Sequence, residues 1–192
     1  MDIETLSKEC EILKNALLPN LANANDPARP DYNEDEKKKI AAFCVMSHAE
    51  LEFFVESLLR KKIEESITAI QNTPSDKVIP NLCFSFGKEK RKPSPFDINQ
   101  AKEWYLKIIA DNHGIKVSNL NSLLEPIGIH VNTLDQNLVS ELNSFGADRG
   151  KFAHNSFTKV VREIPNPNDL YERVKRIITL LKVFEQTVGA LK

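Results

Sequence analysis

Apolar side chains recur at intervals of three and four residues along most of the chain, the spacing that places them on one face of an α-helix. The pattern predicts helices over residues 3–18, 34–70, 99–112, 118–127, from about 134 onward, and 166–188. On the longest helix the expected buried face consists of Ile40, Phe43, Cys44, Leu51, Phe54, Val55, Leu58 and Leu59. Little of the sequence alternates as a strand would, so the predicted fold is all-α, a helical bundle of five or six helices.

Polar residues and prolines mark the expected boundaries between these helices. Ser118 is a candidate N-cap, and the last helix has Asn166 as its cap, Pro167 at its first position and Asp169 in its first turn. Residues 73–97 contain prolines that interrupt the helical rhythm, so they are predicted to form a long irregular loop with a short extended piece around Leu82–Phe86.

Composition narrows the class of protein. The chain has 192 residues, of which 41% are hydrophobic and 28% charged, as expected for a single domain over 1–192 rather than for a disordered or membrane chain. The N-terminus lacks the basic start and apolar run of a signal peptide. Cys10, Cys44 and Cys83 lie far apart and are interpreted as reduced thiols, which favours the cytoplasm. The net charge of −1 excludes a generally basic surface that coats nucleic acid, so any RNA contact requires a local patch.

One helix carries an arginine in its apolar stripe, which runs Leu138, Leu142, Phe145, Arg149 and Phe152. A guanidinium does not lose its charge, and burying it without a partner is costly. Arg149 must therefore meet a carboxylate, a phosphate or a water-filled cleft.

Gly146 and Gly150 form a second, nearly bare stripe beside the arginine. Glycine within a helix costs about 1 kcal/mol relative to alanine, so this pair indicates that another backbone or a ligand comes close. Five residues after Arg149, His154 is expected about 140° around and about 7.5 Å along the helix, so the two would flank a groove. The alternatives are structural: an arginine in an internal ion pair, and a histidine that caps the helix or lies on the surface.

The segment "LNSFGADRGKFAHNS", with Arg149, four residues and His154, resembles the motif of the HEPN superfamily. The surrounding sequence and "SHAELEFFVESLLRK" on the early helix are similar to bacterial HEPN domains of the RiboL-PSP type. This resemblance covers about residues 39–191. The helix and loop of residues 1–38 and the "GKEKRKPSP" segment have no firm counterpart in it.

The resemblance implies an endoribonuclease that needs no metal or cofactor and acts as a homodimer through the helix of Arg149 and His154, with both protomers' motifs in one cleft. Arg149 would hold the scissile phosphate and His154 would transfer protons. Glu52 on the early helix would orient one of them, with Glu50 as the weaker candidate. His48 is interpreted as a helix-face residue, and His113 is given no role.

The expected partner is RNA. Lys88, Lys90, Arg91 and Lys92 in the proline-bounded loop, with Gly150 and Asn155 beside the motif, are the candidate substrate-binding residues. An antitoxin or regulatory protein is a further expected partner, in a toxin or antiphage setting; no membrane contact is expected.

Two alternatives stay open. One is a catalytically silent HEPN module that dimerises and binds a nucleotide or RNA, since active members often have a polar residue where this chain has Gly150. The other is a purely structural partner in which Arg149 pairs internally with Glu52.

Overall fold

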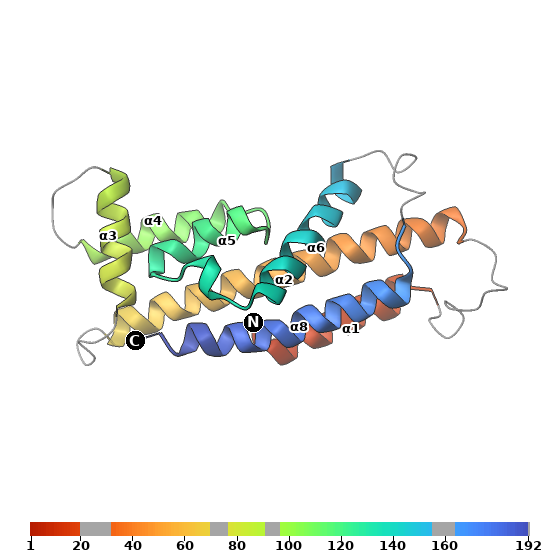
Figure 1. Ribbon diagram of the computed structural model, residues 1–192, viewed down its shortest axis with the longest axis horizontal. Coiled ribbons are helices and arrows are strands. Elements are labelled where there is room, and N and C mark those ends of the chain that lie inside the picture. The colour runs from red at the N-terminus through yellow and green to blue at the C-terminus, as the bar shows by residue number, and fades with distance from the viewer. Residues whose placement is uncertain (20–31, 70–76, 91–96, 155–163, 192) are drawn as a thin grey trace.

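A computed structural model describes residues 1–19, 32–69, 77–90, 97–154 and 164–191, without the His154 side chain. These residues form α-helices and short 3₁₀ turns: α1 (Ile3–Leu17), α2 (Glu34–Ala69), α3 (Val78–Lys90), α4 (Ile98–Ala110), α5 (Val117–Leu124), η2 (Glu125–Ile127), η3 (Val131–Thr133), α6 (Gln136–His154) and α8 (Pro167–Gly189). Figure 1 shows α2 running along the whole molecule, with α1 and α8 beside it on one side and α4, α5 and α6 on the other. The predicted all-α fold is confirmed.

The long helices begin at side-chain caps that their sequences supply. At the start of α2, Asn33 Oδ1 accepts from the Glu36 backbone N–H (2.9 Å) while Glu36 Oε2 accepts from the Asn33 N–H (3.0 Å), a reciprocal capping box. Asn166 Oδ1 accepts from the Asn168 N–H (2.8 Å), and Pro167 occupies the first position of α8. The predicted start of the last helix is therefore confirmed.

The core gathers around α2, which contacts α1, α3, α4, α6 and α8. All eight residues predicted for its inner face are buried. Tyr105 of α4 is also fully buried, and its hydroxyl donates to the Leu123 carbonyl oxygen (2.7 Å), so this polar group is satisfied within the core. The fixed position of α2 in this core sets where its polar residues meet the other helices.

The prediction of an irregular loop over residues 73–97 was wrong for its central part, because residues 78–90 form helix α3. Pro80 is the third residue of α3, in the first turn, where the backbone N–H groups have no partner within the helix. Val78, Ile79, Leu82 and Cys83 are buried. This helix is the reason that seven α-helices, rather than five or six, occur in the described ranges.

The prediction of Ser118 as an N-cap was also wrong. Lys116 occupies the N-cap position of α5, and Ser118 lies inside the helix, where its carbonyl oxygen accepts from the Ser122 hydroxyl (3.1 Å). The helix ends at Leu124 rather than near 127, because the chain tightens into η2 and then reverses at Gly128 (φ +86°).

In the described ranges, no helix combines the length and apolar character needed to cross a membrane.

Candidate functional site

Helix α6 presents Arg149 at the edge of the core. Leu138, Leu142 and Phe145 of the predicted stripe are buried, whereas Arg149 and Phe152, which continue it, are partly exposed. The stripe was thus predicted correctly up to Phe145. Arg149 lies where the core opens to solvent, so its charge keeps access to water or to a ligand.

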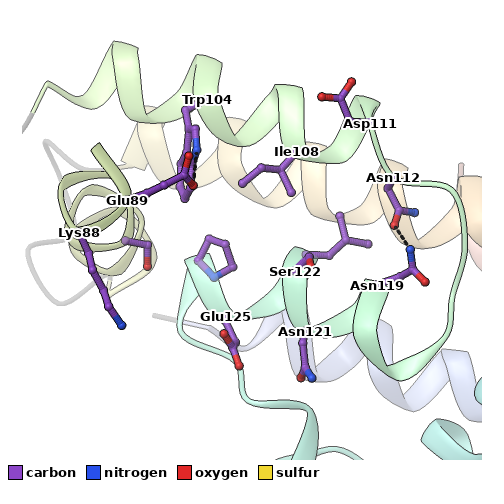
Figure 2. Close-up of a pocket in the computed structure, with 13 residues that line it drawn as sticks. Lys88, Glu89, Trp104, Ile108, Asp111, Asn112, Asn119, Asn121, Ser122 and Glu125 are labelled. Carbon is purple, nitrogen blue, oxygen red and sulfur yellow. Dashed lines mark hydrogen bonds between the residues drawn. The ribbon is translucent and has the colours of Figure 1, made fainter. Parts of the chain in front are cut away.

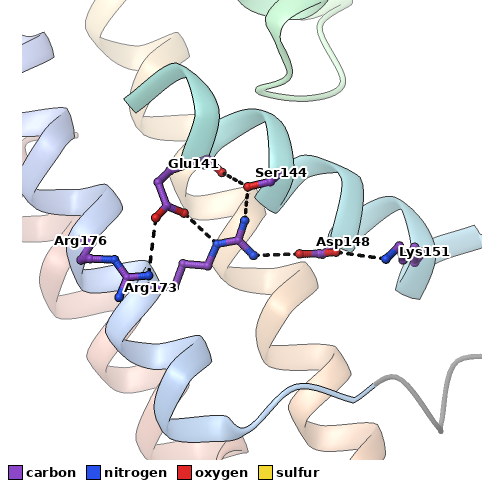
Figure 3. Close-up of polar contacts among 6 residues, drawn as sticks. All are labelled: Glu141, Ser144, Asp148, Lys151, Arg173 and Arg176. Atoms are coloured by element: carbon purple, nitrogen blue, oxygen red, sulfur yellow. Dashed lines mark hydrogen bonds and ion pairs between the residues drawn. The ribbon is translucent and has the colours of Figure 1, made fainter. Parts of the chain in front are cut away.

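Arg173 of α8 fixes α6 in this orientation. Its guanidinium donates to Glu141 Oε2 (2.9 Å), to Asp148 Oδ2 (2.8 Å) and to the Ser144 hydroxyl, all on one face of α6 (Figure 3). It also lies over the Phe145 ring, 5.3 Å from the centroid. Arg173 was not among the residues predicted from the sequence, although Glu141 and Asp148, seven apart on one helix face, were a signal that a cation faces them.

Arg149, in contrast, forms no ion pair or hydrogen bond with any described residue. Its charge favours a lower pKa at His48 and opposes the rise in the pKa of Glu52, so Arg149 lies near these α2 residues without bonding to them. The internal Arg149–Glu52 ion pair that the structural alternative requires is therefore not formed within the described part of the chain. Within the described residues no carboxylate bonds to Arg149, so of the three expected partners a phosphate or a water-filled cleft fits this part of the chain.

Glu52 belongs to a network of polar groups between α2 and the loop that follows α4. The side-chain amide of Asn112 donates to Glu56 Oε1 at 2.9 Å, to the Gly114 carbonyl oxygen at 3.0 Å and to Glu52 Oε1 at 3.2 Å. Asn119 in turn donates to Asn112 Oδ1 (3.2 Å). One amide thus holds two carboxylates in place beside Arg149, and nothing in the sequence pattern identified Asn112.

The pKa of the Glu52 carboxyl is raised, first by burial and then by the neighbouring Glu56 charge. Arg149, His113 and the backbone of Gly114 act in the opposite direction. His113, which was given no role, therefore lies close enough to influence this carboxylate. Glu50 faces elsewhere: burial and the charge of Glu9 on α1 raise its pKa, which separates it from the motif.

His48 lies under Arg149 and is only 2% exposed. Its ring stacks on Phe145, with centroids 6.2 Å apart. Its Nδ1 has no hydrogen-bond partner among the described residues, because the nearest carboxylate oxygen, Glu52 Oε2, is 3.6 Å away. His48 therefore lies on the buried face of α2, packed against Phe145 of α6.

The glycine stripe is partly covered by Lys116 of the α4–α5 loop. A Cβ at Gly146 would lie 2.9 Å from Lys116 Cγ and 3.5 Å from His48 Nε2. At Gly150 the nearest atom outside the helix backbone would be Lys116 Nζ, 4.0 Å away. The close approach predicted at Gly146 therefore comes from a lysine stem, and the side of Gly150 is more open.

The burial of His48 predicts a specific pH dependence of stability. Burial, with the charges of Arg149 and Lys116, lowers the pKa of His48 from 6.5 to about 4. As the pH falls below 6.5, His48 becomes protonated in the unfolded chain but stays neutral in the folded protein, so the free energy of unfolding decreases down to about pH 4. The burial of His48 should therefore lower the free energy of unfolding by about 2 kcal/mol between pH 7 and pH 5.

Urea unfolding of the wild type and of His48→Leu at pH 7 and pH 5 measures this contribution. The variant should lose less stability on acidification than the wild type. Glu52 acts in the opposite direction in both proteins, because its pKa is raised in the folded state, so the difference between the two proteins isolates His48. Equal losses in both would contradict a buried, neutral His48.

The described lysines of the predicted basic patch, Lys88 and Lys90, lie far from Arg149 within one chain. Lys88 and Lys90 are on α3, at one end of α2, whereas α6 ends toward the other end (Figure 1). Lys90 pairs with Glu89 (2.8 Å), whose other oxygen accepts from Trp104 Nε1 (2.9 Å).

A groove of about 710 Å³ runs between α3, α4 and α5, and Figure 2 shows Lys88, Glu89 and Trp104 at one end of it and Asn112 and Asn119 at the other. Its charged lining residues are Lys88, Glu89, Asp111 and Glu125. This largely acidic lining does not favour a phosphate backbone.

Arg91, Lys92 and Asn155 lie outside the described residues. His154 ends α6, and its side chain lies outside the described part.

Comparison with protein-family models matches residues 4–190 to the family RiboL-PSP-HEPN. The chain belongs to this family, as the resemblance indicated. The match begins earlier than the predicted residue 39, so it includes α1 and the segment around α3. No curated protein and no solved structure matched the chain.

Proposed function

We propose that this protein is a metal-independent endoribonuclease whose active site is built around Arg149 and His154. The observation that carries the proposal is Arg149: a permanent cation at the opening of the core that makes no ion pair within the described residues, on a helix anchored by a second arginine. An arginine whose task is structural makes the contacts that Arg173 makes. An arginine whose task is to bind an anion is left without an internal partner.

The proposed reaction is attack of the RNA 2′-oxygen on the adjacent phosphorus. A base takes the 2′-hydroxyl proton, the 2′-O–P bond forms, the P–O5′ bond breaks, and an acid protonates the departing 5′-oxygen. His154 supplies the proton transfers, and Arg149 stabilises the charge that develops on the phosphate. Glu52, held by Asn112, attracts the guanidinium of Arg149 electrostatically without forming an ion pair with it. The products carry a 2′,3′-cyclic phosphate and a 5′-hydroxyl.

A homodimer completes the proposed site, because one histidine cannot be base and acid in the same step. Two large apolar side chains of α2, Met46 and Phe53, are 46% and 56% exposed and lie two turns apart, which offers apolar area to a second copy. Each protomer would contribute its own Arg149 and His154. The proposed setting is the cytoplasm, in a toxin or antiphage system under the control of a regulatory protein.

A second candidate is a catalytically silent HEPN module that binds RNA or a nucleotide. Gly150 favours it, since this position beside Arg149 offers no side chain to contact a phosphate. Arg149 would then bind the anion without promoting cleavage.

The test is incubation of the purified wild-type chain with end-labelled total RNA and tRNA in excess EDTA. The expected result is cleavage that survives chelation and leaves 5′-hydroxyl ends, which polynucleotide kinase labels without prior phosphatase treatment. A copy carrying both Arg149→Ala and His154→Ala, prepared in parallel, controls for contaminating nucleases. RNA binding without cleavage by a folded, dimeric wild type would support the silent module instead.

A further inference from the structure

A second cation, Lys116, lies near Arg149 and has no partner among the described residues. Lys116, the N-cap residue of α5, is exposed, and it forms no ion pair or hydrogen bond through its ammonium with any described residue. Most of the other charged groups near α6 are paired: Arg173 and Arg176 with Glu141, and Lys151 with Asp148. Two adjacent cations without a carboxylate partner repel each other, so an anion between them would relieve that repulsion.

The path of the Lys116 side chain places its charge at the motif. Its stem crosses Gly146, where a Cβ would come within 2.9 Å of Cγ, and its Nζ ends 4.0 Å from where a Cβ of Gly150 would lie. Gly150 directly follows Arg149 in the chain. Gly146 thus leaves the room that lets the lysine stem lie against α6 and carry its ammonium toward the arginine.

Buried His48 lies beneath the lysine stem. It is 2% exposed, its Nε2 faces Gly146, and its Nδ1, which lies 3.6 Å from Glu52 Oε2, makes no hydrogen bond with the described residues. Buried polar atoms are nearly always bonded. A neutral imidazole below two cations adds no positive charge to the repulsion between them.

We infer that Lys116 is a second phosphate-binding residue of the Arg149 site and holds an RNA phosphate together with Arg149. This inference rests on the proposed function, since it concerns the same substrate. Lys116 belongs to the loop that also carries Asn112, the residue that holds Glu52. One loop therefore supplies both a cation for the substrate and the amide that fixes the carboxylate.

The experiment measures binding separately from cleavage. A fluorescein-labelled single-stranded oligonucleotide with 2′-O-methyl groups throughout cannot react, because its 2′-oxygens are blocked. Fluorescence anisotropy from 50 to 300 mM salt gives its affinity for the wild type, Lys116→Ala, Lys116→Arg and Lys182→Ala. Lys182 is an exposed residue of α8, so its variant carries the same change in net charge away from the site.

Lys116→Ala should bind the oligonucleotide about five- to tenfold more weakly at low salt, and its slope of log affinity against log salt should be shallower by about 0.7, the share of one phosphate contact. Lys116→Arg and Lys182→Ala should keep the wild-type slope. Gly146→Ala keeps the charge but displaces the lysine stem, so it should weaken binding without lowering the melting temperature.

Two results overturn the inference: a wild type that does not bind the oligonucleotide, or Lys116→Ala binding with the affinity and salt slope of the wild type. Cleavage of unmodified RNA by the same proteins separates this failure from failure of the proposed function. A wild type and a Lys116→Ala variant that cleave equally well would refute the role of Lys116 and leave the nuclease intact. Binding that depends on Lys116, without cleavage of RNA by the wild type, would support the role of Lys116 and refute the nuclease activity.

Discussion

Arg149→Ala should cleave RNA about 100- to 1,000-fold more slowly than the wild type, the usual cost of removing a group that stabilises charge in a transition state. The same variant should unfold at or near the wild-type temperature. The reason is that Arg149 contributes no ion pair or hydrogen bond among the described residues, so its removal leaves no internal group unsatisfied. A large loss of activity with little loss of stability is therefore expected.

Single-turnover cleavage assays in EDTA and thermal unfolding measure the two effects. Arg149→Lys keeps the charge but not the paired, planar donors, so it should recover only part of the lost rate. Arg173→Ala is the matched contrast: it removes a guanidinium bonded to two carboxylates, Glu141 and Asp148, and should lower the melting temperature. An Arg149→Ala variant that cleaves RNA normally, or that melts as early as Arg173→Ala, would contradict the proposed role.

The contrast between these arginines shows what the sequence could predict. The apolar period located α6 and placed Arg149 on its inner face, because side-chain burial follows the helix repeat. The partners of an arginine depend on which helices pack together, and periodicity carries no information about that. Arg173 became recognisable only when α8 lay against α6 in the fold.

The same limit applies to the loop between α4 and α5. Glu52 was identified because its helix resembles the early helix of HEPN domains, whereas Asn112 and Lys116 lie in a short connection that carries no motif or repeat. The glycines predicted the approach of another backbone or a ligand, whereas the group that lies against Gly146 is the Lys116 side chain, which a glycine in a sequence does not identify. Helix α3 was not predicted because of Pro80. A proline in the first turn is compatible with a helix, but in the sequence a proline was taken to interrupt the helical pattern.

A purified dimer of one wild-type and one His154→Ala protomer should cleave RNA about 100-fold more slowly than the wild-type dimer, as expected for loss of general acid–base catalysis. In the proposed site both histidines face one phosphate, one as base and the other as acid, so a single substitution disables the shared centre. Two independent sites would instead leave the mixed dimer with half of the wild-type rate.

Different affinity tags on the two protomers allow the mixed dimer to be isolated, and its rate is compared with that of a mixed dimer of wild type and Lys182→Ala, which should be unaffected. Retention of half the activity would show that each protomer carries a complete site and that His154 acts alone. In that case a second proton-transfer group must lie within the same chain. His48 does not fit that role, since it is 2% exposed and burial lowers its pKa to about 4. The next residues to replace are His113, whose charge acts on Glu52, and Glu52 itself, whose pKa is raised by burial.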